Sequence, residues 1–444
     1  MGNYIKKINT LIINYFNKVC KLQLFAYNNV KKILVIILAC FYIYPFKLNI
    51  SYWWIVNVLY YSVPVFCCFR NIKYLKQLFV AFGLQKYIFY SLLFLSLALL
   101  WSFLIFTKVG DFSFILECYL KPVWFLVRLV FVYLLTIKTY GNGFMAFVRV
   151  MMYATVLYVF FSLIMIVNMD FALYWMSILE LDKEIVSIES DYTRIGLMGR
   201  TYADTSMAIS LLLMGVCCGN GRFNLKISDK IGVIFLLIGN FLYGRLGLVM
   251  SFLIICCMFR VTTSIKLRTL YTLFILLAVF ITIVEIISLN VDPMILDYAI
   301  SWVLEPIESL LFSSSKALSL GESGDILIHK MYFSVEDSTF LWGDGFYEPN
   351  GVRYMGTDAA FMRKVLYGGI IQISLLYISA VFLLIGYYRR YRSCYGQQII
   401  KIICLSGLVL LMGEFKDTLY PKWYVIMVMY YITQLSTLVD NKIK

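Results

Sequence analysis

Five arginines lie at the edges of the apolar stretches of this chain, where permanent positive charge can bind a ligand. Guanidinium groups are planar and always charged, and they form bidentate hydrogen bonds with phosphate oxygens. A cluster of such groups predicts a binding site for a diphosphate. The five candidates are Arg194, Arg200, Arg245, Arg353 and Arg363.

Two of these arginines differ in what their surroundings indicate. Arg245 lies between two glycines in an otherwise apolar stretch, and an arginine at the centre of a span would cost about 2.5–3.5 kcal/mol. We therefore interpret Arg245 as a functional residue at the membrane surface. Arg363 leaves two alternatives open. It binds the ligand, or it only snorkels at a helix end together with Lys364.

Carboxylates near these arginines can act as general bases for a hydroxyl nucleophile. Asp358 lies between the last two of the five arginines, and Glu414 is followed two residues later by Lys416. We predict Asp358 or Glu414 as the base, and Lys416 as a cation that helps to bind substrate. The alternative for Glu414 is a structural ion pair with Lys416 or Lys422.

Lys121 and Arg128 are seven residues apart and therefore share one face of a helix. We expect Lys121 to snorkel outward. Arg128 either neutralises a lipid phosphate or pairs with Glu117 or Glu285, and the structural pairing is the preferred interpretation. His329 is the single histidine and the eleven cysteines contain no CxxC motif, which argues against a metal site. We predict no metal and no other cofactor.

The composition decides the class of protein that must position these residues. The chain has 444 residues, 62% of them hydrophobic and 14% charged, and its mean hydropathy is +0.82. An ordinary soluble domain has about 25% charged and about 45–50% apolar residues. This composition excludes a soluble enzyme, a disordered protein and a secreted disulfide scaffold. It predicts an all-α polytopic integral membrane protein, with residues 1–444 forming a single membrane domain.

Apolar runs recur after a polar to amphipathic beginning in which no cleavable signal peptide is evident. About twelve transmembrane helices follow from them, although the seventh and eighth runs are short for a span of roughly 20 residues. Glycines at 244 and 247 favour a tight hairpin between these two runs. The predicted spans are 33–50, 52–69, 87–107, 119–137, 149–168, 202–218, 230–243, 246–260, 269–290, 363–388, 399–413 and 420–438.

The charges orient these spans. Of the 25 acids, 18 fall within residues 169–204 and 291–361. With both termini in the cytoplasm, the cytoplasmic segments collect 24 of the 39 Lys and Arg residues, as the positive-inside rule requires. Two large segments, 169–201 and 291–362, then lie outside. The basic balance therefore indicates contact with membrane lipids and not with nucleic acid.

The order of these parts resembles the O-antigen polymerases (Wzy) of lipopolysaccharide assembly. About twelve spans, two external segments with the larger one late in the chain, and a broken hairpin between them are the shared topology. Tyr243-Gly-Arg-Leu-Gly-Leu248 resembles the Ser/Gly-Arg-x-Gly-Leu turn of the family. Thr357-Asp-Ala-Ala-Phe-Met-Arg363, continuing to Gly368-Gly369, resembles its Thr-Asp-x-x-aromatic-x-Arg pattern. Gly413-Glu-Phe-Lys416 and Arg194-x-Gly196 resemble two shorter motifs.

This resemblance implies a metal-independent glycosyltransferase of the bacterial inner membrane, with two periplasmic segments. The growing glycan on undecaprenyl diphosphate would be the donor, and a repeat unit on the same carrier would be the acceptor. Arg194, Arg200, Arg245 and Arg353 would hold the diphosphates, and Asp358 or Glu414 would orient or deprotonate the acceptor hydroxyl. Whether a chain-length regulator protein is a further partner is left open.

Two other functions are weighed against a polymerase. An O-antigen ligase is disfavoured because Thr357-Asp358 stands where ligases have a motif with His and Asn. A flippase or other transporter of the lipid-linked oligosaccharide should carry its charges in a central cavity between small loops. Here the spans are nearly free of charge, and the charges lie in two external segments.

Overall fold

The protein is described from a computed structural model, which covers most of the apolar chain. The described residues are 29–46, 48, 50–83, 85–141, 143–179, 195–200, 203–219, 227–259, 326, 329–396 and 398–443. The predicted span over 269–290 lies outside these residues, as do most of the two acidic segments. The described part is helical throughout, apart from one short β-hairpin, so the expected all-α membrane architecture is confirmed at this level.

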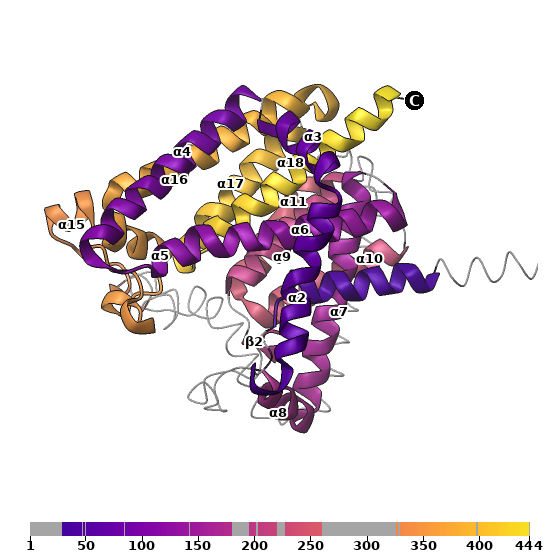
Figure 1. Cartoon of the computed structure of the whole chain (residues 1–444), viewed down its shortest axis with the longest axis horizontal. Helices are drawn as coiled ribbons and strands as arrows, with labels where there is room; N and C mark the ends of the chain where they lie inside the picture. Colours follow the sequence, from indigo (N-terminus) through magenta and orange to yellow (C-terminus); the bar gives the residue numbers. More distant parts are fainter. Residues whose placement is uncertain are drawn as a thin grey trace, which may run out of the picture.

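The helices follow one another with short connections (Figure 1). A first helix covers 29–43 and is followed by α2 (Ile50–Arg70), α3 (Ile72–Gly83), α4 (Lys86–Val109), α5 (Ser113–Ile115), the π-helical turn η1 (Leu116–Leu120), α6 (Lys121–Tyr140), α7 (Phe144–Val167), α8 (Met169–Ile178), the antiparallel strands β1 (Ile195–Gly196) and β2 (Gly199–Arg200), α9 (Ala203–Gly219), α10 (Ile227–Tyr243), α11 (Arg245–Phe259), α15 (Asp337–Trp342), the 3-10 turns η4 (Pro349–Gly351) and η5 (Tyr354–Gly356), α16 (Ala360–Tyr395), α17 (Gln398–Lys416) and α18 (Tyr420–Ile443).

Five helical stretches in the described part are long and apolar enough to cross a membrane. They are Lys86–Val109, Ser113–Tyr140, Phe144–Val167, Ala360–Ser393 and Gln398–Lys416. The pair α2 and α3, bent by 75° at their junction, would make a sixth, and α9 and α11 are shorter apolar helices. The structure is thus that of a helical, multi-pass membrane protein, and the count of twelve spans stays a prediction.

Helix α3 was not expected, because its lysines favour a cytoplasmic loop between the second and third predicted spans. Its apolar residues nevertheless recur at helical spacing, and Leu75, Leu78 and Phe82 are buried. The ring of Phe82 meets that of Tyr431 on α18, with 5.2 Å between centroids. Residues 72–83 therefore form an amphipathic helix that packs against α18.

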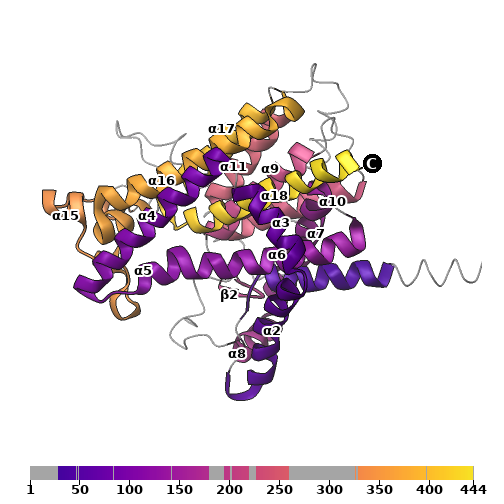
Figure 2. The ribbon, with the colours of Figure 1, turned by 45° about the horizontal axis from the view of Figure 1, so that its top comes forward.

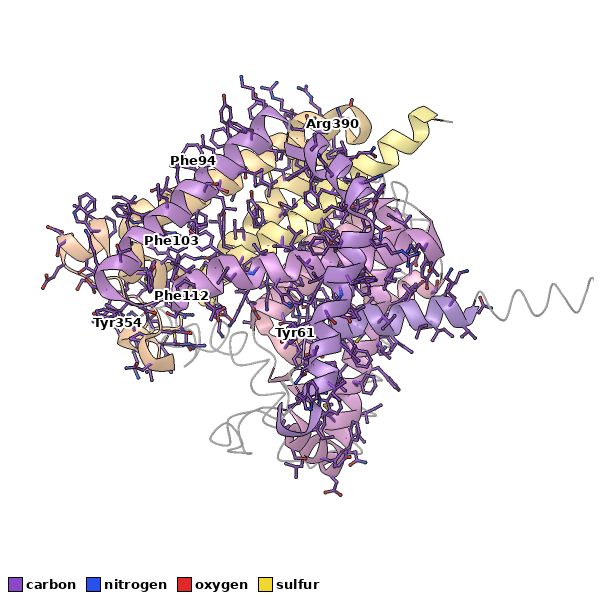
Figure 3. The ribbon with its side chains drawn as sticks, in the orientation of Figure 1. Tyr61, Phe94, Phe103, Phe112, Tyr354 and Arg390 are labelled. Carbon is purple, nitrogen blue, oxygen red and sulfur yellow. The ribbon has the colours of Figure 1, made fainter. Side chains whose placement is uncertain are left out.

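Helices α4 and α16 run side by side along most of their length in both views (Figures 1 and 2). Small polar side chains join them: the Ser91 hydroxyl donates to the carbonyl oxygen of Ser379 at 2.7 Å, and both residues are buried. The other face of α4 exposes large apolar side chains such as Leu100 and Phe103 (Figure 3). Such a face suits contact with lipid.

Helix α16 is broken near its start. Gly369 has φ +65° and ψ −169°, so the first turns, which carry Arg363, are offset from the rest of the helix. The break leaves carbonyl groups without helical donors. The backbone N–H of Asp344 donates to Leu366 O at 2.6 Å, and the Trp101 indole N–H donates to Gly368 O at 3.1 Å. The loop after α15 therefore completes the hydrogen bonding of the broken helix.

We expect Gly369→Ala to lower the free energy of unfolding by about 1–3 kcal/mol, because alanine is strained at positive φ and its Cβ would overlap the carbonyl oxygen of Leu341. The unfolding midpoint in a detergent titration measures this. Gly407→Ala in α17 is the matched control, since its nearest new contact would be 3.8 Å away. Equal midpoints for the two variants would contradict the strained turn.

The hairpin predicted at Gly244 is confirmed. Helix α10 ends at Tyr243 and α11 begins at Arg245. The side-chain amide of Asn240 donates to the Ser251 hydroxyl at 2.6 Å. In one continuous helix these residues would be separated by roughly 16 Å, so the two helices turn back on each other. A side chain at Gly247 would overlap Ser206 of α9, which explains a glycine there.

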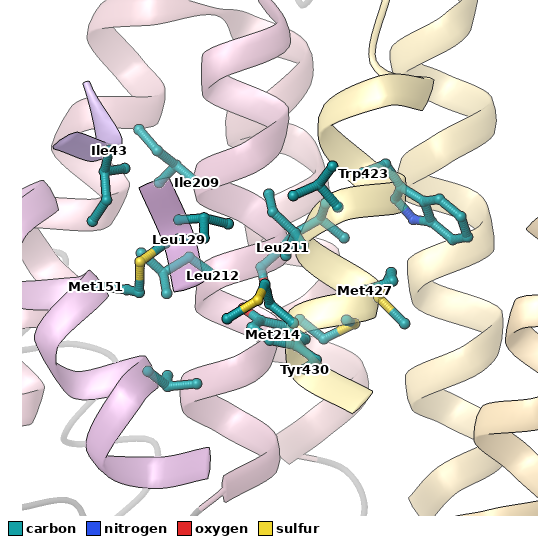
Figure 4. Close-up of a cluster of buried hydrophobic side chains, with 14 of the residues drawn as sticks. Ile43, Leu129, Met151, Ile209, Leu211, Leu212, Met214, Trp423, Met427 and Tyr430 are labelled. Carbon is teal, nitrogen blue, oxygen red and sulfur yellow. The ribbon is translucent and has the colours of Figure 1, made fainter. Parts of the chain in front are cut away.

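The core lies where α9 and α18 meet α6 and α7. Leu211, Leu212 and Met214 of α9 pack toward Trp423 and Met427 of α18 (Figure 4). Its largest fully buried side chain, Trp423, donates its indole N–H to Ser406 O at 2.9 Å, which satisfies its one polar atom. This core supports the floor of the site described next.

Candidate functional site

A cavity of about 620 Å³ lies between the start of α6, the N-terminal end of α9, the loop that holds η4 and η5, and the turn from α17 to α18. Its floor is apolar and shares Met151, Ile209 and Leu212 with the core in Figure 4. Its walls are charged. The cavity is lined by the cations Lys121, Arg128, Arg353, Arg363 and Lys422 and by the acids Glu117, Asp204, Glu348 and Asp417.

The first wall comes from η1 and α6. Glu117, Lys121, Trp124 and Arg128 are three or four residues apart in succession, which sets them on one face of the helix. The π-helical turn at Leu116–Leu120 precedes them, and such turns are frequent at functional sites. This face therefore presents two cations, one acid and an indole to the cavity.

Arg128 is the deepest charge on this wall. Its side chain is only 7% exposed and its guanidinium lies 5.6 Å from the ring centre of Phe125. Of its expected structural partners, Glu117 forms an ion pair with Lys121, and Glu285 lies outside the described residues. Within the described part of the chain, Arg128 Nε and Trp124 Nε1 find no hydrogen-bond acceptor. The preferred pairing with Glu117 is therefore wrong.

Arg363, in the first turn of α16, dominates the opposite wall. Its guanidinium stacks 3.9 Å from the ring centre of Tyr347, and Nη2 donates to Glu348 at 2.5 Å. Nη1 donates to the Thr418 hydroxyl at 3.5 Å, whereas Nε has no acceptor among the described residues. The side chain is 5% exposed, so Arg363 is held in the cavity wall and does not snorkel.

Arg353 and Asp358 form an ion pair with each other, and both side chains are well exposed. Arg353 lines the cavity, but Asp358 is not part of its lining. The two residues lie on either side of η5, so the ion pair closes this loop across the 3-10 turn. The structure thus gives Asp358 a partner that holds Arg353 beside the cavity.

Glu414 lies outside the cavity lining and is 2% exposed. It forms a buried ion pair with Lys364, and it accepts hydrogen bonds from the Tyr377 hydroxyl at 3.1 Å and from the backbone N–H of Tyr420 at 2.5 Å. Its partner is therefore neither Lys416 nor Lys422. Because this carboxylate is fully buried and neutralised, a hydroxyl in the cavity cannot reach it.

Asp204 and Asp417 share one wall of the cavity. Asp204, in the first turn of α9, forms an ion pair with Lys422 of α18. Asp417 follows α17, and its Oδ1 accepts the backbone N–H of Thr418 at 2.7 Å. Burial and the nearby Asp204 carboxylate raise the pKa of Asp417 to about 6, although Thr418, Lys422 and Arg353 act in the opposite direction.

The remaining predicted residues contribute less to this picture. Arg194 and the side chains of Arg200 and Arg245 lie outside the described part of the chain, although Arg245 is placed at the start of α11. Lys416 is half-buried and is not in the cavity lining. His329 is exposed. Within the described ranges, no group of three His, Cys, Asp or Glu side chains is arranged to hold a metal ion.

Sequence reasoning found Arg353 and Arg363 but assigned no role in the site to Asp204, Glu348, Asp417 or Lys422. Each of these is a single charge near a helix end, a position where charges are common on any membrane protein. Only Lys121 and Arg128 carried a spacing signal that could have been followed further.

Chemically, the cavity offers positive charge above an apolar floor. Four of its five cations have carboxylate partners, but Arg128 has none among the described residues, and two buried guanidinium groups keep an N–H without an acceptor. Such donors suit an anionic, oxygen-rich ligand attached to an apolar group. Comparisons with protein-family models, curated proteins and solved structures find no match for this chain.

Proposed function

We propose that the protein polymerises O-antigen repeat units by transferring the growing glycan from undecaprenyl diphosphate to a new lipid-linked repeat unit. The observation that carries this proposal is the pair of buried guanidinium groups, Arg128 and Arg363, each with an Nε that has no acceptor among the described residues, above an apolar cavity floor. A diphosphate would receive the free N–H groups, and the first isoprene units would contact the apolar floor. The resemblance described above supplies the glycan.

In this proposal the enzyme is a metal-independent glycosyltransferase. Arg353 and Arg363 hold the diphosphate and stabilise the charge that develops on the leaving group. Arg128 and Lys422 join them from the cavity lining. The sequence adds Arg194, Arg200 and Arg245 as further diphosphate-binding residues, with Arg245 at the turn between α10 and α11.

The proposal includes a membrane placement. The chain would cross the bacterial inner membrane about twelve times, with both termini in the cytoplasm and with segments 169–201 and 291–362 in the periplasm. The cavity would then open at the periplasmic face, because it is lined by Met198 between β1 and β2 and by the loop that contains Tyr347 and Arg353. Lipid-linked repeat units are extended on that side of the membrane.

A gel of surface lipopolysaccharide from cells with and without the gene tests the proposal. We expect cells without the gene to lose the ladder but to keep the core that carries one repeat unit. Loss of every repeat unit would instead indicate a ligase or a flippase, and the membrane leaflet that holds the lipid-linked unit would separate these two. An unchanged ladder in cells without any second polymerase would contradict the proposal.

A further inference from the structure

We infer that Asp417 is the catalytic residue that accepts the proton of the acceptor hydroxyl, and that Asp204 and Lys422 set its proton affinity. This inference rests on the proposed glycan transfer and names the base for it. It replaces Asp358 and Glu414, the two carboxylates that the sequence favoured, because neither of them lines the cavity.

The position of Asp417 is the first argument. Its carboxyl group lies in the same cavity lining as Arg353 and Arg363, the cations that would hold the diphosphate. Two buried guanidinium groups in this lining keep an unpartnered N–H, which marks the cavity as a ligand site independently of its acids. A base in this wall is therefore close to the place where the leaving group must be bound.

The availability of its oxygens is the second argument. Glu348 and Asp204 are each engaged in an ion pair, with Arg363 and Lys422 respectively, and Glu117 pairs with Lys121. Asp417 forms no ion pair within the described ranges, and there only its Oδ1 accepts a hydrogen bond. Of the four acids in the lining, Asp417 is thus the one that keeps a carboxylate oxygen for a substrate hydroxyl.

Three charged groups face Asp417, each from a different element: Asp204 from α9, Lys422 from α18 and Arg353 from the loop between η4 and η5. The like charge of Asp204 makes the Asp417 carboxylate a stronger base, whereas the two cations weaken it. A pKa of about 6 leaves Asp417 ionised at neutral pH and better able to accept a proton than an ordinary aspartate.

The step balances as a displacement at the donor sugar. The acceptor hydroxyl oxygen forms a bond to the anomeric carbon while its proton passes to the Asp417 carboxylate. The bond from the anomeric carbon to the phosphate oxygen breaks, and undecaprenyl diphosphate leaves with the electron pair. Arg353 and Arg363 take up the charge on this leaving group, and Asp417 then releases its proton to water.

The test measures polymer formation in membrane vesicles that contain the full chain and undecaprenyl-diphosphate-linked repeat units. We expect Asp417→Asn to lower kcat by about 10²–10⁴-fold, the usual contribution of a general base, with little change in KM. Asp417→Glu should recover part of the rate. The control is Asp337→Asn, which changes an exposed carboxylate at the start of α15.

The pH profile separates a base from a merely structural aspartate. The wild-type rate should fall as the pH drops through about 6, because the protonated carboxyl cannot accept a proton. Asp204→Asn removes the like charge and should move this inflection to lower pH, whereas Lys422→Met should move it to higher pH. A normal rate for Asp417→Asn, or an inflection that neither variant moves, overturns the inference. Absence of polymer from the wild-type vesicles would instead contradict the proposed function itself.

Discussion

Replacement of Arg363 with alanine is expected to reduce polymer formation by about 10²–10³-fold, the usual cost of removing one preorganised donor from a site that stabilises developing negative charge. The side chain is buried in the cavity wall and is oriented by Tyr347, Glu348 and Thr418. Its unpartnered Nε–H is therefore fixed in place before a substrate binds. The rate with lipid-linked repeat units in membrane vesicles measures the effect.

Two further variants make this prediction specific. Arg363→Lys keeps the charge but loses the planar group that stacks on Tyr347, so we expect only partial recovery of the rate. Arg390→Ala removes an exposed arginine near the other end of α16, far from Tyr354 and the cavity loop (Figure 3), and should leave the rate unchanged. If Arg363→Ala inserts normally and polymerises as fast as wild type, Arg363 does not stabilise the leaving group.

Replacement of Lys364 with methionine is expected to lower the free energy of unfolding by about 3–5 kcal/mol, because it leaves a buried carboxylate without its counter-ion. Lys364 and Glu414 are 1% and 2% exposed, so water cannot replace the lost partner. The pair joins the first turns of α16 to the end of α17. Its loss should therefore also disturb the turn that carries Asp417.

A double variant tests whether the cost arises from the uncompensated charge. In Lys364→Met combined with Glu414→Gln, no charge is buried, and the amide oxygen can still accept the Tyr420 N–H. We expect this double variant to be much more stable than Lys364→Met alone in a detergent unfolding titration. Lys330→Met, at an exposed site, is the control. A double variant as unstable as the single one would mean that packing, and not charge, stabilises this contact.

The apolar runs predicted most of the described helices, because a span must satisfy its backbone hydrogen bonds within one helix and cover itself with apolar side chains. The turn at Gly244 was predictable for a related reason, since two short runs separated by glycines cannot form one straight span. Helix α3 escaped this reasoning. Its spacing is amphipathic, and its lysines obscured the buried face that packs against α18.

The break in α16 shows the limit of local pattern. The pair Gly368-Gly369 is visible in the sequence, but glycines are also common where helices pack closely. A strained turn forms here because the loop from Asp344 supplies donors for the freed carbonyl groups, with Trp101 adding another. These donors come from residues far away in the chain, so the break is a property of the tertiary structure.

The sequence by itself determined that this is a helical membrane protein, that its charges gather in particular segments, and that Arg353 and Arg363 are candidates for binding an anion. Hydrophobicity and charge act through the local chain, so these features can be read without knowing the packing. The tertiary structure alone decided that Glu414 pairs with Lys364, that Glu117 leaves Arg128 unpaired within the described residues, and that Asp417 lines the cavity. Ion pairs and cavities depend on which helix ends meet, and that depends on the fit of side chains from distant parts of the chain.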